Sequence, residues 1–175
     1  NPQLLEGLAG GAAPAPQSQG TAPACETGAD ADARVDCRIT GTVNSLNAFW
    51  PAYLQQYNVR YPQPETVIFD EAVSTGCGTA SSAVGPFYCP TDTTAYFDPG
   101  FCTELVNRFG SSGGHLAQEY VVAHEFGHHI QNVLGDLDRA QQDPQGPESG
   151  AVRVELQADC YAGLWAKHAS TQPGP

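Results

Sequence analysis

Two histidines and a glutamate in one short stretch have the types and the spacing to bind and use a metal ion. His124 and His128 are four residues apart, and Glu125 directly follows the first of them. Residues four apart lie on one face of a helix, with Cβ atoms about 5–6 Å apart, so both imidazoles can reach one ion. The H-E-x-x-H pattern indicates two zinc ligands and a general base. A chance match on a buried helix is the alternative.

Two acidic residues further along the chain could complete such a site. Glu155 and Asp159 are also four residues apart, within a stretch rich in Val, Leu and Ala. Catalytic zinc is commonly bound by two His and one Glu, with a fourth position for water, so Glu155 is the predicted third ligand. We expect Asp159 to accept a hydrogen bond from a ligand histidine and to fix its tautomer. The alternative is that both acids lie on a solvated helix surface.

Four stretches of the chain resemble the bacterial neutral zinc metallopeptidase family, a gluzincin-like group of the zincins. They are HEFGHHIQN (124–132), ELQADCYAG (155–163), TGCG (75–78) and GPFYCP (85–90), so the resemblance covers roughly residues 67–166. It implies His124, His128 and Glu155 as ligands of Zn²⁺ and Glu125 as the base. It also implies an α+β zincin-like fold with a small antiparallel or mixed sheet, a helix that carries H-E-x-x-H and a third-ligand helix. Family members usually continue into a further helical segment with another His-containing motif, whereas this sequence ends at Pro175.

Composition narrows the class of protein. The 175 residues suit a single domain, and the net charge is −12. Nucleic acids and anionic membranes require clustered Lys and Arg, so neither is an expected partner. No run of about 20 apolar residues is present that could span a membrane. The chain has neither an initiator Met nor a recognisable signal peptide, which indicates a processed product.

The N-terminal part differs in composition from the rest. Residues 1–24 are rich in Ala, Gly, Pro and Gln and are predicted to form a flexible tail or tether, and residues 25–175 the metallopeptidase domain. Six cysteines without a C-x-x-C pair favour an oxidising compartment. We therefore expect a secreted or extracytoplasmic protein, with the N-terminal segment as its potential tether.

Six cysteines allow fifteen pairings. The expected disulfides are Cys25–Cys37, Cys77–Cys89 and Cys102–Cys160. The first two are local and lie in turn-rich stretches. The third would hold the helix that carries Glu155 against the rest of the domain. The alternative is that Cys160 is a free, buried thiol.

Several elements must position these residues. Apolar residues at intervals of three and four predict a helix from about Thr42 to Tyr57, which Pro51 either bends or divides. Residues 65–70 and 94–98 are predicted strands. Phe87-Tyr88 and Tyr96-Phe97 flank a short turn and predict a hairpin, and the flanking prolines favour an edge strand or a strand end. Such an edge could pair with an extended peptide.

The ligand residues themselves are predicted to lie on helices. The motif helix should run from about His115 to Leu134 and stop at Gly135. Ser149 should cap the third-ligand helix, which extends to about residue 169, and residues 135–150 should form a long loop. Asp98-Pro99 should begin another helix that continues to about Phe109. A glycine inside the motif, Gly127, should allow close backbone approach beneath the zinc.

The predicted reaction is zinc-dependent hydrolysis of peptide bonds in a peptide or an unfolded protein. Glu125 would accept a proton from a water molecule activated by zinc and deliver it to the leaving amine. A further donor must stabilise the developing negative charge. The candidates, among which the sequence does not choose, are His115, Tyr120, Tyr88, Tyr96, His129 and His168.

Two other functions use the same ligands. One is a catalytically silent zinc-binding domain that presents its edge strand to a protein partner. The other is a zinc hydrolase that acts on a bond other than the peptide bond. Cobalt or manganese could also occupy these ligands in place of zinc.

Overall fold

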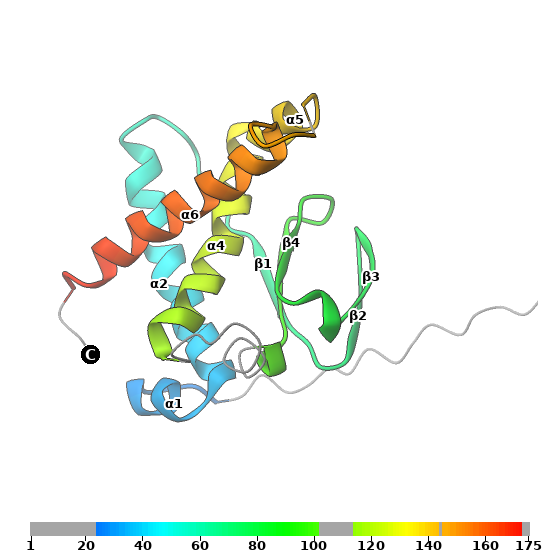
Figure 1. Cartoon of the computed structure of the whole chain (residues 1–175). Helices are drawn as coiled ribbons and strands as arrows, with labels where there is room; N and C mark the ends of the chain where they lie inside the picture. Colours follow the sequence, from blue (N-terminus) through cyan, green and yellow to red (C-terminus); the bar gives the residue numbers. More distant parts are fainter. Residues whose placement is uncertain (1–23, 102–113, 144, 173–175) are drawn as a thin grey trace, which may run out of the picture.

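The computed structural model describes residues 24–101, 114–143 and 145–172. Its helices are α1 (Gly28–Ala33), α2 (Val35–Gln55), η1 (Ser82–Val84, a 3-10 turn), α4 (His115–Leu134), α5 (Asp136–Ala140) and α6 (Gly150–Ala169). Its strands are β1 (Glu65–Ile68), β2 (Ala72–Thr75), β3 (Gly78–Ser81), β4 (Phe87–Cys89) and β5 (Thr94–Phe97). In Figure 1 the long helices α2, α4 and α6 gather on one side and the strands on the other. This is the predicted α+β class.

Three strands form the small mixed sheet that the sequence predicts. β5 is in the middle, with β1 parallel to it on one side and β4 antiparallel on the other. In the hairpin of β4 and β5, Phe87 lies opposite Tyr96, and their rings stack with centroids 4.9 Å apart. Pro86 and Pro90 flank the edge strand β4, where a missing N–H does not interrupt the ladder. The expected hairpin and its edge strand are confirmed.

A second hairpin, made of β2 and β3, lies between β1 and β4 in the chain. Asp92 connects its turn to the main sheet. The Asp92 carboxylate accepts hydrogen bonds from the Gly76 N–H at 2.6 Å and from the Tyr96 hydroxyl at 2.8 Å. The Cys77–Cys89 disulfide joins the same turn to β4. The small hairpin is therefore held to the sheet by both polar and covalent links.

Removing the Cys77–Cys89 disulfide should measurably destabilise the domain. The bond closes a loop with a sequence separation of 12, for which the chain-entropy model gives about 3 kcal/mol. We expect the double variant Cys77→Ala/Cys89→Ala to lose about that much free energy of unfolding in urea denaturation. An unchanged denaturation midpoint would contradict this expectation.

The hydrophobic core lies between the three long helices and the inner face of the sheet. α4 packs against α2, α6, β4 and β5. The fully buried side chains at its centre include Leu46, Trp50, Phe97, Phe126 and Ile130. α2 begins earlier than predicted and continues through Pro51 as one helix, so Pro51 does not divide it. Pro51 is itself exposed, on the side of the helix away from this core.

The boundaries of the two ligand helices agree with the sequence prediction. α4 ends at Gly135, which has a left-handed φ of 74°. The Ser149 side chain accepts a hydrogen bond from the Val152 N–H at 3.3 Å and so caps α6. The predicted long loop between these helices instead contains the short helix α5, which packs against both α4 and α6.

Close contact between α4 and α6 depends on Gly127. A Cβ atom built at this position would lie 2.9 Å from the Ala158 Cα and 3.0 Å from the Ala158 carbonyl oxygen. Real side chains do not approach backbone this closely. The predicted close approach of backbone at Gly127 is confirmed, and its partner is the helix that carries Glu155.

Two of the three expected disulfides are present. Cys25–Cys37 and Cys77–Cys89 have Cα atoms 5.2 and 5.8 Å apart. Cys160, in contrast, is a free, exposed cysteine, which differs from both the expected bond and the buried thiol. Its expected partner, Cys102, lies outside the described residues. Cys160 is two positions, about 200° around the helix, beyond the buried Ala158, so the helical period turns it away from the core.

Some expectations fall on parts of the chain that the structure does not describe. One is the predicted tail, of which only Ala24 is described. The other is residues 102–109 of the helix predicted after Asp98. The start of that helix is described, and the Asp98 carboxylate accepts a hydrogen bond from the Gly100 N–H at 2.8 Å. Among the described residues, no helix is long and apolar enough to cross a membrane.

Candidate metal centre

The structure brings the three predicted ligands together where α4 and α6 cross. Their candidate ligand atoms all lie within 4.8 Å of one another. The His124 Nε2 atom is 3.3 Å from Glu155 Oε2, and the His128 Nε2 atom is 3.7 Å from Glu155 Oε1. Two atoms bound to one zinc ion at about 2.1 Å with tetrahedral angles would be about 3.4 Å apart. The donor types and their spacing therefore fit a zinc ion.

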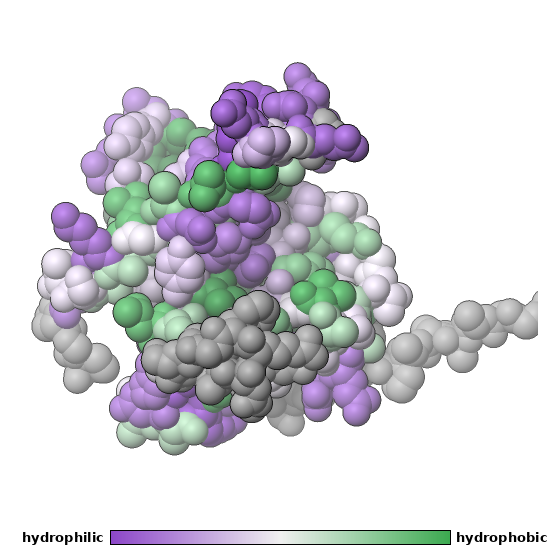
Figure 2. Space-filling view, in the orientation of Figure 1, coloured by the Kyte–Doolittle hydropathy of each residue, from purple (hydrophilic) through white to green (hydrophobic). Residues whose placement is uncertain are grey.

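Local helical geometry explains why the two imidazoles converge. His124 and His128 are one turn apart on α4, and their ring centroids are 4.8 Å apart with the planes nearly perpendicular. Both side chains are mostly buried, with 19% and 16% of their surface exposed. Figure 2 shows hydrophilic surface at the centre of this face, over the crossing of α4 and α6.

Glu155 reaches the site from the exposed side of α6. Its side chain is 61% exposed, so it does lie on a helix surface, yet its oxygens face both imidazoles. The sequence suggests an apolar and enclosed surrounding, but Val152 and Leu156 are themselves 37% and 59% exposed. They lie on the outer side of α6, because the side that packs on the core is that of Ala158 and Ala162.

His124 is oriented by Asp159, as the sequence predicts. The His124 Nδ1 atom is 2.9 Å from Asp159 Oδ1, and the Tyr120 hydroxyl donates to the same oxygen at 2.8 Å. A carboxylate can only accept, so Nδ1 carries the proton and the Nε2 lone pair is left for a metal. Burial, together with the hydrogen bond to Asp159, raises the pKa of Tyr120 to about 12, so its hydroxyl stays a donor at neutral pH.

His128 is oriented by a residue that the sequence analysis does not single out. Its Nδ1 atom is 2.8 Å from the side-chain oxygen of Gln131, which is fully buried. Burial lowers the pKa of His128, which favours the neutral imidazole that metals bind. Gln131 follows His128 by three residues, so a polar side chain at this spacing inside an apolar helix is the signal that could have indicated it.

Glu125 lies beside the predicted ligands and is almost completely buried, with 8% of its surface exposed. The backbone of Tyr88 in β4 interacts with this carboxylate and favours its charged form. Burial raises the pKa of Glu125 to about 7, and the nearby Glu155 carboxylate adds to this rise. A cation bound at the neighbouring ligands would act in the opposite direction, because positive charge favours the carboxylate.

Of the six candidate donors for the developing charge, Tyr120 contacts the ligand shell through Asp159. The other five have different surroundings. His129 is buried and interacts with the Pro62 carbonyl at 2.7 Å and with the Tyr88 hydroxyl at 3.0 Å. His115 is near Asp32, Tyr96 bonds Asp92, and His168 lies against Phe49.

The role of His129 becomes clear from its hydrogen bonds. A carbonyl only accepts, so Nε2 of His129 donates to Pro62 and Nδ1 accepts from the Tyr88 hydroxyl. The Tyr88 hydroxyl in turn accepts from Asn132 Nδ2 at 2.9 Å. Both ring nitrogens of His129 therefore take part in hydrogen bonds, and this buried side chain links α4 to the segment before β1.

The fold and the site together define an α+β protein in which two crossing helices bring together a His–His–Glu group that could hold a metal ion. Comparison with known families agrees with this class: the chain belongs to the family described as "Putative neutral zinc metallopeptidase", whose family model matches residues 2–174.

The curated relatives that the chain matches are named as uncharacterized proteins. The chain is 58% identical to the uncharacterized protein Rv2575 of Mycobacterium tuberculosis over 147 residues, which are 84% of this chain and 49% of the relative. It is 40% identical to the uncharacterized protein YpfJ of Escherichia coli over 130 residues, which are 71% of this chain and 45% of the relative. The chain thus spans about half the length of the curated relatives that it matches. No solved structure matches it.

Proposed function

We propose that this chain contains the active site of a zinc-dependent endopeptidase. The observation that carries the proposal is the convergence of His124, His128 and Glu155 on one point, with the buried carboxyl of Glu125 beside them and outside the ligand set. Family membership supports zinc as the ion and a peptide as the substrate. When bound, zinc would lower the pKa of a water molecule and polarise the scissile carbonyl.

Glu125 is the proposed general base. Its carboxylate accepts a proton from the attacking water and then donates that proton to the nitrogen of the leaving amine. Burial without being a ligand suits this task, because the carboxyl can exchange a proton while the three ligands keep their positions. Tyr120 and Asp159 hold the His124 ring, so that its Nε2 atom remains directed at the metal.

The edge strand β4 is the proposed site for the substrate backbone. The backbone of Tyr88 interacts with the Glu125 carboxylate, and α4 packs against β4, so this edge strand lies beside the proposed base. An extended peptide that pairs with this edge would bring its backbone close to Glu125. Such binding uses hydrogen bonds to the peptide backbone and therefore requires an unfolded chain.

The proposed compartment is extracytoplasmic. Its support is the pair of disulfides, Cys25–Cys37 and Cys77–Cys89, which persist in oxidising surroundings.

Metal analysis is the first test of the proposed site. We expect the purified chain to bind one zinc ion, and Glu155→Ala to weaken this binding strongly because a third of the protein ligands is lost. Elemental analysis after dialysis against trace zinc measures the stoichiometry. Retention of tightly bound zinc by Glu155→Ala would show that Glu155 is not a ligand.

Hydrolysis of an unfolded protein is the second part of this test. The zinc-loaded chain should cleave a denatured, fluorescently labelled protein, and a chelator should stop the cleavage until zinc is restored. One zinc per chain without any cleavage would favour the alternative, a silent zinc-binding domain that presents β4 to a protein partner. Cleavage that persists after the metal has been removed would contradict the proposal outright.

A further inference from the structure

One buried amide connects the two helices of the candidate metal centre. Gln131, on α4, is fully buried. Its Oε1 atom is 2.8 Å from the Nδ1 atom of His128. Its Nε2 atom donates to the backbone carbonyl of Val154 at 2.6 Å and to Gln157 Oε1 at 2.9 Å, and both partners are on α6. A single side chain thus contacts a ligand on one helix and the backbone beside the third ligand on the other.

The partners of this amide determine which way it faces. The Val154 carbonyl can only accept, so the NH₂ group of Gln131 must face α6 and its oxygen must face His128. The Nδ1 atom of His128 must then carry the proton. Its Nε2 atom is left with a lone pair directed toward Glu155, which is the tautomer that a metal requires.

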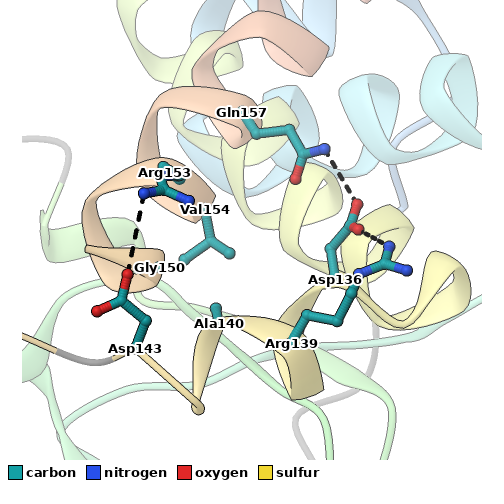
Figure 3. A pocket seen from close by; sticks show the side chains of 8 residues that line it. All are labelled: Asp136, Arg139, Ala140, Asp143, Gly150, Arg153, Val154 and Gln157. Carbon is teal, nitrogen blue, oxygen red and sulfur yellow. Dashed lines mark hydrogen bonds and ion pairs between the residues drawn. The ribbon is translucent and has the colours of Figure 1, made fainter. Parts of the chain in front are cut away.

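A second amide and a carboxylate extend this arrangement outward. Gln157 Nε2 donates to Asp136 Oδ2 at 3.0 Å, and Arg139 bonds the other Asp136 oxygen. Figure 3 shows these side chains lining a pocket beside α6, with dashed lines for the Gln157–Asp136 and Asp136–Arg139 bonds. Because a carboxylate accepts only, Asp136 fixes the Gln157 amide with its oxygen toward Gln131.

We infer that Gln131 is a positioning residue of the metal centre, and that Gln157 and Asp136 fix its direction. The inference rests on the proposed zinc site. It adds that one side chain, Gln131, determines both the tautomer of His128 and the position of the helix that carries Glu155. The two ligand histidines are therefore oriented by different means, His124 by a carboxylate directly and His128 by an amide.

The variant Gln131→Met tests this inference, because it keeps an unbranched side chain of similar length but removes both hydrogen-bonding groups. We expect zinc affinity, measured by competition with a chromogenic chelator, to fall about 10- to 100-fold, the usual loss when an outer partner of a ligand is removed. In the metal-free protein, ¹⁵N spectra of the imidazoles should show that His128 changes from one tautomer, protonated at Nδ1, to a mixture.

Asn132→Leu is the matched control. Asn132 is the next residue of α4 and donates to the Tyr88 hydroxyl, so this variant loses a comparable hydrogen bond that does not involve a ligand. Its zinc affinity and the His128 tautomer should both stay as in the wild type. An equal loss of affinity in both variants would show that only general destabilisation is being measured, and would overturn the inference.

Two further outcomes are informative. Unchanged zinc affinity and an unchanged His128 tautomer in Gln131→Met would overturn the inference while leaving the proposed zinc site intact. A wild-type chain that binds no zinc would instead overturn the proposed function. If Gln131→Met does not fold, Gln157→Met serves in its place, because Gln157 lines the open pocket. It should shift affinity and tautomer in the same direction by less, and no shift would count against the inference.

Discussion

Replacing Glu125 by glutamine is expected to remove most turnover and to leave the zinc in place. The amide keeps the size of the side chain but cannot accept a proton from water, and general acid–base catalysis contributes about 10²- to 10⁴-fold. We therefore expect kcat on an unfolded protein substrate to fall by that factor. Zinc stoichiometry, measured on the same sample, should stay near one per chain.

Glu119→Gln is the control for this prediction, since it makes the same chemical change on the same helix. Glu119 precedes His128 by nine residues, which places it about 180° around α4 from that ligand. It should keep both zinc and activity. Loss of zinc in Glu125→Gln would show that Glu125 is itself a ligand, and the proposed division of roles would then be wrong.

Gly127→Ala should separate the two ligand helices. The added Cβ would lie 2.9 Å from the Ala158 Cα, so α6 has to move. Overpacking of this kind costs about 1–3 kcal/mol. The gain in helix propensity of about 1 kcal/mol offsets only part of that cost. Because the displaced helix carries Glu155, both the free energy of unfolding and the zinc affinity should fall.

Gly163→Ala gives the comparison that isolates this effect. Gly163 is also inside a long helix, α6, but a Cβ built there meets nothing within 4 Å. This variant should be as stable as the wild type or slightly more stable, with unchanged zinc affinity. Thermal denaturation of both variants measures their stability, and competition with a chelator measures their zinc affinity. If the two alanines behave alike, close approach at Gly127 is not what places Glu155.

The residues that come together at the candidate metal centre could be predicted from the sequence because their signals are local. Four-residue spacing on a helix brings His124 and His128 together whatever surrounds them, and it relates Glu155 to Asp159 in the same way. The end of α4 and the start of α6 could be predicted for the same reason, because Gly135 ends a helix through its left-handed backbone and Ser149 caps one through its side chain. The two short-range disulfides belong to the same category.

Features that depend on contacts between distant segments could not be predicted in this way. The parallel pairing of β1 with β5 joins residues that are far apart in the chain, and no local pattern specifies it. Gln131 is significant only because Val154 and Gln157 lie opposite it on α6. α5 has five residues, too few for a helical period to be recognised. The exposure of Cys160 could not be predicted either, because it depends on which face of α6 packs on the core.

The unequal exposure of the three proposed ligands has a consequence for the order of folding and metal binding. The hydrophobic core forms from α2, α4, α6 and the sheet, and none of the three proposed ligands belongs to it. We therefore expect folding to precede metal loading, unlike small domains that fold only around their ion.

With His124 and His128 mostly covered and Glu155 open to solvent, an incoming ion would meet the glutamate first and then pass to the imidazoles. A site that is filled last takes its ion from whatever surrounds the folded chain, since ligands of this kind discriminate weakly among divalent metals. The compartment in which the chain finishes folding, more than its ligand set, would then decide which metal it carries.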